Sequence, residues 1–344
     1  MTGTVHAVLP GDVDDPATPS GGNRYDRRVL DGLAAGGWVV HEHPVPGGWP
    51  HPEPVDRVGL AGLLDALPDG AVVLLDGLVA STVPEVLGPR ATRLRLVVLV
   101  HLPLDHAAES AALRCATLVV TTSGWTRRWL LDRYALPVGR VRVAAPGVDP
   151  APPAPGSPAG GQLLCVAAVT PLKGHDTLVD ALALVADLPW RCVWVGSLSR
   201  DPGFVDRLRR RIAGNGLAGR VRLAGPRAGP ALDAAYAAAD LLLLASRVET
   251  YGMVVTEALA RAVPVLATAA GGLPDTLGRA PDGTPPGLLV PPGDPAALAG
   301  ALRRWLTDPA LRGRLRRAAH HRRAALTDWT TTTTALATAL EGTA

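Results

Sequence analysis

Short apolar runs recur along this chain, and each is followed by turn residues and a stretch with helical periodicity. In the first half these runs are residues 5–9, 38–41, 71–75, 96–100 and 117–121. Continuous apolar strands separated by helices are typical of a parallel sheet that helices cover on both faces. The alternation therefore predicts an α/β fold.

The alternation of apolar runs and helical stretches is interrupted at residues 146–161, which are mostly Pro, Gly, Ala and Ser. We expect this segment to form an exposed linker. Beyond it, apolar runs resume at residues 163–167, 192–195, 221–224, 241–245 and 263–267. A chain of 344 residues is long enough for two domains. We expect domains at 1–150 and 151–326, with a cleft between them that holds the active site. Residues 327–344 are expected to form a C-terminal helix, with Trp329 as its anchor.

Composition excludes several classes of protein. The net charge is only +3, so we expect no nucleic-acid partner. The cysteines are few and widely spaced, as is usual for buried apolar residues in a reducing compartment. We see neither a secretory signal nor an apolar stretch of about 20 residues that would span a bilayer, and we expect a cytoplasmic protein. The basic stretch 311–326 is interpreted as a solvated helix; weak peripheral membrane contact is the alternative. The oligomeric state is not determined.

The most informative segment is residues 240–275. A predicted strand ends in the polar turn 246–250, and a helix then begins at Gly252. The free N–H groups of such a helix form an anion site that suits a diphosphate, and glycine lets the phosphate approach closely. Glu249 in the turn is placed to accept hydrogen bonds from sugar hydroxyls, and Glu257 two turns later from ribose hydroxyls. The alternative is that both glutamates are solvated surface charges.

In this order of strand, turn, glutamate, aromatic residue, glycine, helix and second glutamate, the sequence resembles the retaining, family-4-type glycosyltransferases of group 1, whose signature is an E-x7-E element. The resemblance covers most of the chain and is densest over residues 163–294. It implies a GT-B fold of two doubly wound Rossmann-like domains facing across a cleft, with no metal ion and no cofactor besides the nucleoside diphosphate sugar as co-substrate. It also implies that Glu249 contacts the donor sugar and Glu257 the ribose, and that the C-terminal helix crosses back to the first domain. The donor-binding residues expected in this element are Thr250, Tyr251, Gly252, Met253 and Glu257.

Lys173, the single lysine of the chain, follows the first strand of the second half and is expected to face the donor diphosphate. The resembled family usually has an arginine five residues earlier, where Ala168 stands here. In that family the arginine and the lysine together hold the donor diphosphate, and here the arginine of this pair is missing. His175 and Arg127 are candidates to compensate, and the sequence does not choose between them. The Gly271-Gly272 turn is expected near the donor sugar.

In the first half, Gly21 and Gly22 open a predicted helix and offer backbone N–H groups to the donor diphosphate. His101 directly follows a predicted strand. We expect it to orient a donor hydroxyl or relay a proton; the alternative is a buried histidine with a structural role. Asp12-Val13-Asp14 has the D-x-D form of a metal-binding motif but no supporting pattern, and we interpret it as a solvated loop.

The predicted function is therefore retaining transfer of a glycosyl group from a nucleoside diphosphate sugar to a hydroxyl acceptor, with His101 and Glu249 as the catalytic residues. The acceptor is expected to be a small natural product, a lipid-linked glycan or a polyol. Two alternatives remain open: a GT-B phosphorylase or epimerase, and a non-catalytic protein that binds nucleotide sugars.

Overall fold

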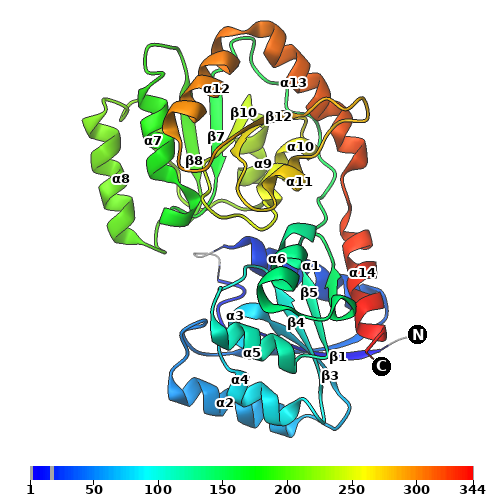
Figure 1. Cartoon of the computed structure of the whole chain (residues 1–344). Coiled ribbons are helices and arrows are strands. Elements are labelled where there is room, and N and C mark those ends of the chain that lie inside the picture. Colours follow the sequence, from blue (N-terminus) through cyan, green and yellow to red (C-terminus); the bar gives the residue numbers. More distant parts are fainter. Residues whose placement is uncertain (1–2, 16–18, 344) are drawn as a thin grey trace. The chain divides into compact units, whose positions relative to one another are not determined.

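The computed structural model describes residues 3–15 and 19–343, which form two compact units (Figure 1). Unit 1 comprises Gly21–Gly147, the N-terminal residues up to Asp15, and the C-terminal segment from Thr327. Unit 2 comprises Val148–Leu326 together with a short segment that ends at Ser20. The C-terminal segment therefore belongs to the same unit as the N-terminal half.

Within the described residues, unit 1 contains a six-stranded parallel sheet with the order β2-β1-β3-β4-β5-β6. Its strands are β1 (Thr4–Pro10), β2 (Val39–Val45), β3 (Val72–Asp76), β4 (Arg95–Val100), β5 (Leu118–Thr121) and β6 (Val141–Val143). The central strands β3, β4 and β5 are almost wholly buried. This explains their continuous apolar sequence, because a parallel sheet covered on both faces has no solvent-facing side.

Helices cover both faces of this sheet. One face is packed by residues of α2, α3, α4, α5 and α6, and α1 packs with α14, drawn in red in Figure 1. The helices are α1 (Gly21–Ala35), α2 (Pro54–Ala66), α3 (Gly77–Ala80), α4 (Pro84–Leu87), α5 (Ala107–Cys115), α6 (Gly124–Tyr134) and α14 (Trp329–Glu341), with short 3-10 turns η1 (Gly88–Arg90) and η2 (Val138–Arg140). At the start of α14 the Trp329 ring meets the edge of Tyr25 at a centroid distance of 6.0 Å.

Unit 2 repeats this architecture within Val148–Leu326, all of which the structure describes, with the order β12-β11-β10-β7-β8-β9, again all parallel. Its strands are β7 (Gln162–Val166), β8 (Arg191–Val195), β9 (Val221–Leu223), β10 (Leu241–Leu244), β11 (Val265–Thr268) and β12 (Gly287–Val290). The order reverses between β7 and β10, so that the carboxyl ends of these two strands form a topological switch point, where open α/β sheets bind ligands.

Two apolar clusters lie on the two faces of the unit 2 sheet. One gathers α7, α8, α12 and α13, and the other gathers α9, α10 and α11 (Figure 1). The helices are α7 (His175–Ala183), α8 (Pro202–Gly214), α9 (Gly229–Ala237), α10 (Met253–Ala260), α11 (Leu273–Leu277), α12 (Pro295–Thr307) and α13 (Pro309–Arg322), with 3-10 turns η3 (Pro171–Lys173) and η4 (Arg323–Ala325).

The proline-rich segment 146–161, predicted to be an exposed linker, is exposed only in part, at residues such as Pro152, Pro153 and Pro155. It packs along unit 2, where the Ser157 amide and hydroxyl both donate to the buried carboxylate of Asp240. The Ala154 amide donates to the Arg261 carbonyl at 2.8 Å. Composition identified a segment without helix or strand, but it could not show that partners far along the chain hold that segment in place.

The basic helix α13 uses much of its charge inside unit 2. Arg316 pairs with Asp240 at 2.7 Å, and Arg312 donates to the carbonyls of Trp305 and Leu306. Arginines with such partners have a structural role, and this favours the interpretation of α13 as an ordinary surface helix. None of the helices in the described part of the chain is both long enough and apolar enough to cross a bilayer.

Candidate functional site

The E-x7-E element adopts the geometry expected of an anion site. Strand β10 ends at Leu244, and α10 begins after Gly252, whose φ of +86° is the left-handed conformation that glycine favours. No side chain caps the N-terminus of α10. A Cβ at Gly252 would lie 2.6 Å from Leu273 Cδ2, so a larger residue would crowd this turn. The first N–H groups of α10 are therefore presented at the carboxyl edge of the sheet.

Glu249 and Lys173 meet at this edge. Lys173 Nζ donates to Glu249 Oε2 at 2.6 Å, with the lysine side chain 30% exposed and the glutamate 14%. The glycine turn after β11 closes on the same residue, because the Gly272 amide donates to the Glu249 carbonyl at 2.9 Å. Gly271 has a φ of +54°, and a Cβ there would lie 2.0 Å from that carbonyl oxygen. Loops that follow β7, β10 and β11 are thus joined at one residue, Glu249, through its carboxylate and its backbone carbonyl.

Glu257 is buried, with 6% of its surface exposed, so the alternative that it is a solvated helix charge is wrong. Its Oε2 accepts a hydrogen bond of 2.7 Å from the hydroxyl of Tyr236, a residue of α9. The Arg261 guanidinium lies 4.8 Å from the centre of the Tyr236 ring. A buried carboxylate held by a neutral hydroxyl remains a strong acceptor for further hydroxyl groups, such as a vicinal diol.

The remaining predicted residues of this element lie around the same turn. Thr250 is buried, and Tyr251 and Met253 are half-buried. Burial raises the pKa of the Tyr251 phenol to about 12, which keeps it a neutral hydrogen-bonding group. The structure therefore gathers these three residues with Glu249 and Gly252 in one turn.

The two residues suggested to replace the missing arginine at Ala168 have different surroundings. His175 is fully buried, and burial lowers the pKa of its imidazole to about 4, so the ring is neutral. Arg127 belongs to unit 1, where it donates to the carbonyls of Val141 and Val138. His175 is therefore wrong as the compensating cation, because a neutral buried imidazole carries no charge. The role suggested for Arg127 stays a prediction.

Unit 1 holds a second group of polar side chains at the carboxyl edge of its sheet. His101 Nε2 lies 2.8 Å from Asp26 Oδ1 and 3.6 Å from Asp76 Oδ2. Burial opposes protonation of the ring, but the two carboxylates outweigh it and raise the pKa of His101 to about 9. Burial and the Asp26 carboxylate raise the pKa of Asp76 well above its ordinary value. We name these three side chains the histidine cluster.

Sequence reasoning found His101 but missed Asp26 and Asp76. A signal for Asp76 was present, because it ends an apolar strand just as His101 follows one. Asp26 lies one helical turn after Gly22, and a periodicity argument gives no reason to single it out. Among the described residues, the histidine cluster is also the one group of His, Cys, Asp and Glu side chains that brings three potential metal-ligand atoms within 4.8 Å.

Gly21 and Gly22 form the first turn of α1, as predicted, and Gly22 lies against the imidazole. A Cβ at Gly22 would lie 3.3 Å from His101 Cδ2, so this glycine allows close packing of helix and ring. In the D-x-D motif, Arg27 donates to both carboxylate oxygens of Asp14 at 2.7 and 2.8 Å. Asp14 is therefore ion-paired and not merely solvated.

The loop after His101 is fixed by the buried carboxylate of Glu109. Its Oε2 accepts hydrogen bonds from the Leu104 and Asp105 amides at 2.9 and 3.0 Å and from the Tyr134 hydroxyl at 2.5 Å. Its Oε1 accepts from Ser81. Such a set of donors satisfies a buried carboxylate without a cation, and it makes this loop a rigid support for His101.

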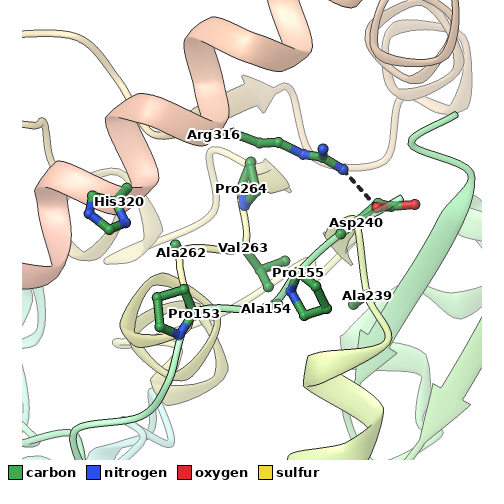
Figure 2. Close-up of a pocket in the computed structure, with 11 residues that line it drawn as sticks. Pro153, Ala154, Pro155, Ala239, Asp240, Ala262, Val263, Pro264, Arg316 and His320 are labelled. Atoms are coloured by element: carbon green, nitrogen blue, oxygen red, sulfur yellow. Dashed lines mark hydrogen bonds and ion pairs between the residues drawn. The ribbon is translucent and has the colours of Figure 1, made fainter. Parts of the chain in front are cut away.

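A separate cavity of about 180 Å³ lies at the opposite, amino-terminal edge of the unit 2 sheet. Figure 2 shows the Arg316–Asp240 pair beside Pro155, with His320 further along α13, the helix that carries Arg316. The Asp240 carboxylate is also held by Ser157 and the Gln162 amide. These polar groups are already paired with one another, so the cavity has the character of a packing defect and not of a ligand site.

Comparisons with known proteins agree with this arrangement. Residues 158–322 match the family model "Glycosyl transferases group 1". The D-inositol 3-phosphate glycosyltransferase of Kineococcus radiotolerans is 37% identical over 227 residues, which covers 59% of this chain and 52% of that protein. The protein of the same name from Jonesia denitrificans is 35% identical over 228 residues, covering 60% and 53%. The chain spans about half the length of these curated relatives. The predicted resemblance to the group 1 glycosyltransferases is confirmed for residues 158–322, and the retaining mechanism stays a prediction.

Solved structures resemble the whole chain. Sucrose-phosphate synthase from Thermosynechococcus elongatus aligns with a TM-score of 0.80 and 22% identity, covering 99% of each chain. Anabaena HepE in complex with UDP and glucose aligns with a TM-score of 0.77 and 17% identity, covering 99% of this chain and 100% of that one. At such identities the likeness shows the fold. The predicted GT-B fold class, with two Rossmann-like units, is confirmed.

Proposed function

We propose that this chain transfers a glycosyl group from a nucleoside diphosphate sugar to a hydroxyl acceptor, with retention of anomeric configuration. One observation carries the proposal: Lys173, Glu249 and the uncapped N-terminus of α10 meet at the switch point of the unit 2 sheet. This edge offers one cation and free N–H groups to a diphosphate, and carboxylates to the sugar and ribose hydroxyls. The match of residues 158–322 to the glycosyltransferase family supports it.

The chemistry assigned to these residues is stabilisation of a leaving group. The bond between the anomeric carbon and the phosphate oxygen breaks, and its electron pair stays on the diphosphate. The acceptor oxygen forms the new bond to that carbon, and its proton passes to the departing phosphate. Lys173 and the dipole of α10 stabilise the developing negative charge. This scheme needs no metal ion and no cofactor, and it names no covalent nucleophile.

UDP-linked sugars are the first donors to test, since HepE is described in complexes with UDP and with UDP-glucose. For the acceptor, the first candidate is an inositol phosphate, because the matching curated relatives are named D-inositol 3-phosphate glycosyltransferases. The small natural products and lipid-linked glycans that we expected from the sequence complete the acceptor panel. We propose a cytoplasmic enzyme organised as domains 1–150 and 151–326 with a C-terminal helix.

A non-catalytic protein that binds nucleotide sugars is the second candidate. The observation in its favour is the cation content of the site: position 168 is alanine, His175 is neutral, and Lys173 is already paired with Glu249. Such a site would bind the nucleotide but would stabilise a leaving diphosphate weakly. Turnover with any acceptor excludes this candidate.

The test is a thermal-shift panel with UDP, GDP, TDP and ADP and their sugar conjugates, because a ligand of the native state raises the unfolding midpoint with concentration. We expect one nucleotide to stabilise the wild type and the control Asp206→Ala, whose side chain is 58% exposed on α8. Glu257→Ala should lose that shift. The stabilising donor is then incubated with the acceptor panel, and NMR of the product reports its anomeric configuration. An inverted product would disprove retention, and no shift with any compound would contradict the donor site itself.

A further inference from the structure

The histidine cluster brings three ionisable side chains together in one buried site. Packing alone does not explain such a group. Asp26 comes from α1, Asp76 ends β3 and His101 follows β4. The side chain of His101 is 15% exposed, while those of Asp26 and Asp76 are 1% and 3% exposed. Buried charges are costly unless they are paired. A cluster of this kind is a functional candidate with a physical reason.

The surroundings fix the orientation of the ring. Nε2 is committed to Asp26 at 2.8 Å, Gly22 packs on the Cδ2 side, and the Tyr25 ring meets the imidazole edge-on at a centroid distance of 5.3 Å. A ligand of this histidine must therefore use Nδ1. The charged or titratable groups that face the ring within the described residues are Asp26 and Tyr25 from α1 and Asp76 from β3. Burial raises the pKa of Tyr25, so its hydroxyl stays neutral.

We propose that Asp26 and Asp76 are positioning residues that hold His101 as an imidazolium, with Nδ1–H donating a hydrogen bond to an oxygen of the substrate. This role rests on the proposed function. It makes His101 a charged hydrogen-bond donor in the transfer reaction and not a general base. An imidazolium suits a sugar hydroxyl or a phosphate oxygen, since both accept hydrogen bonds.

The charge balance of the cluster supports this role. The imidazolium and the Asp26 carboxylate neutralise each other, and Asp76 is driven towards its neutral acid by burial and by Asp26. Asp26 Oδ2 is buried and accepts no hydrogen bond from the described residues. A proton on Asp76 would be shared with the Asp26 carboxylate, because two carboxylates in one buried site favour sharing one proton. With a pKa of about 9, His101 has no free lone pair near pH 7.

The first experiment measures the protonation of His101 by NMR of the ¹⁵N-labelled imidazole, with the resonance assigned from His101→Gln. We expect the wild type to titrate near 9. In Asp26→Asn the pKa of His101 should fall below the ordinary 6.5, because the Asp26 carboxylate no longer offsets the effect of burial on the imidazolium. Asp76→Asn should lower it less. The control Asp65→Asn removes an exposed ion pair with Arg90 and should leave the titration unchanged.

A wild-type imidazole that is neutral at pH 7 would overturn the proposal. So would stoichiometric Mn²⁺ that selectively broadens the His101 resonance, since the same three side chains would then be metal ligands. The proposal expects no such broadening and no effect of EDTA. These results do not depend on turnover, so the proposal can fail or succeed separately from the proposed function.

The second experiment probes contact with substrate. UDP-glucose is added to the labelled protein, and we expect the Nδ1 resonance of His101 to shift. The same shift with UDP alone assigns the contact to phosphate, and its absence with UDP assigns it to the sugar. If neither compound nor the acceptor moves the resonance, the donor role is wrong.

With an active donor, Asp26→Asn should lower kcat at least tenfold with little change in KM, and Asp26→Glu should recover part of the loss.

Discussion

The Lys173 ammonium and the Glu249 carboxylate lie 2.6 Å apart although 76 residues separate them in the chain. This pair joins the two residue types that a glycosyl donor requires, a cation for the diphosphate and an acceptor for sugar hydroxyls. The cation is thus neutralised until a ligand competes for it.

For Glu249→Gln we therefore predict opposite effects on binding and turnover. The amide no longer pairs with Lys173, so UDP should bind as well as before or more tightly. Loss of the charged acceptor should lower kcat by roughly 30–100-fold, the effect of about 2–3 kcal/mol in the transition state. Calorimetry with UDP and steady-state kinetics measure the two effects. Lys173→Met should instead weaken UDP binding, and Asp187→Asn, which removes an exposed ion pair with Arg303, is the control. A parallel loss of UDP affinity and kcat in Glu249→Gln would contradict the prediction.

Tyr236→Phe should raise the donor KM without changing kcat. The variant removes the hydroxyl that holds Glu257 at 2.7 Å, and one such hydrogen bond is worth about 1 kcal/mol, or roughly fivefold. Glu257→Ala should have a larger effect. A 2′,3′-dideoxyribose analogue of UDP provides the control: it should bind wild type weakly and should be insensitive to Glu257→Ala. Equal sensitivity of both nucleotides to that substitution would mean that Glu257 does not contact the ribose.

Gly271→Ala should destabilise unit 2 and abolish donor binding. Its φ of +54° disfavours any side chain, and the new Cβ would meet the Glu249 carbonyl oxygen at 2.0 Å, where backbone must shift. We expect a loss of at least about 2 kcal/mol in the free energy of unfolding, measured with urea. Gly300→Ala is the matched control, because it lies within α12 with nothing within 4 Å of its Cβ, and it should be neutral or stabilising by up to roughly 1 kcal/mol. If the two variants were equally stable, the close approach at Gly271 would be wrong.

The stability of the protein should fall as the pH rises from about 6.5 to above 9. The folded pKa of His101, about 9, lies above the unfolded value of 6.5. Its contribution is therefore complete below pH 6.5 and is lost as the pH passes the folded pKa, a change on the order of 3 kcal/mol. Asp76 acts in the same direction, because its folded pKa is also raised. Urea unfolding at pH 6.5 and 9.5 measures the slope.

His101→Gln should flatten this pH dependence, and a variant that retains the wild-type slope would show that another group is responsible. The measurement stays above pH 6.5 because His175 has the opposite behaviour. Burial lowers the pKa of His175 to about 4, so its contribution is lost as the pH falls from 6.5 through that value.

The sequence by itself determined the elements and the architecture class. Apolar strand runs, the glycine that begins α10 and the spacing from Glu249 to Glu257 are local features, because backbone conformation and periodicity depend on neighbouring residues. The parallel arrangement then places residues that follow β4, β7 and β10 at the carboxyl edges of their sheets, which is why His101, Lys173 and Glu249 could be selected without a structure.

Only the tertiary structure decided which of these groups are charged and what holds them. Asp26 meets His101 across 75 residues, and His175 is neutral because the surrounding core removes it from water. The proline-rich segment packs on unit 2 because Asp240 accepts its hydrogen bonds. Burial and charge pairing are set by side chains from distant segments, and a local pattern carries no information about those partners.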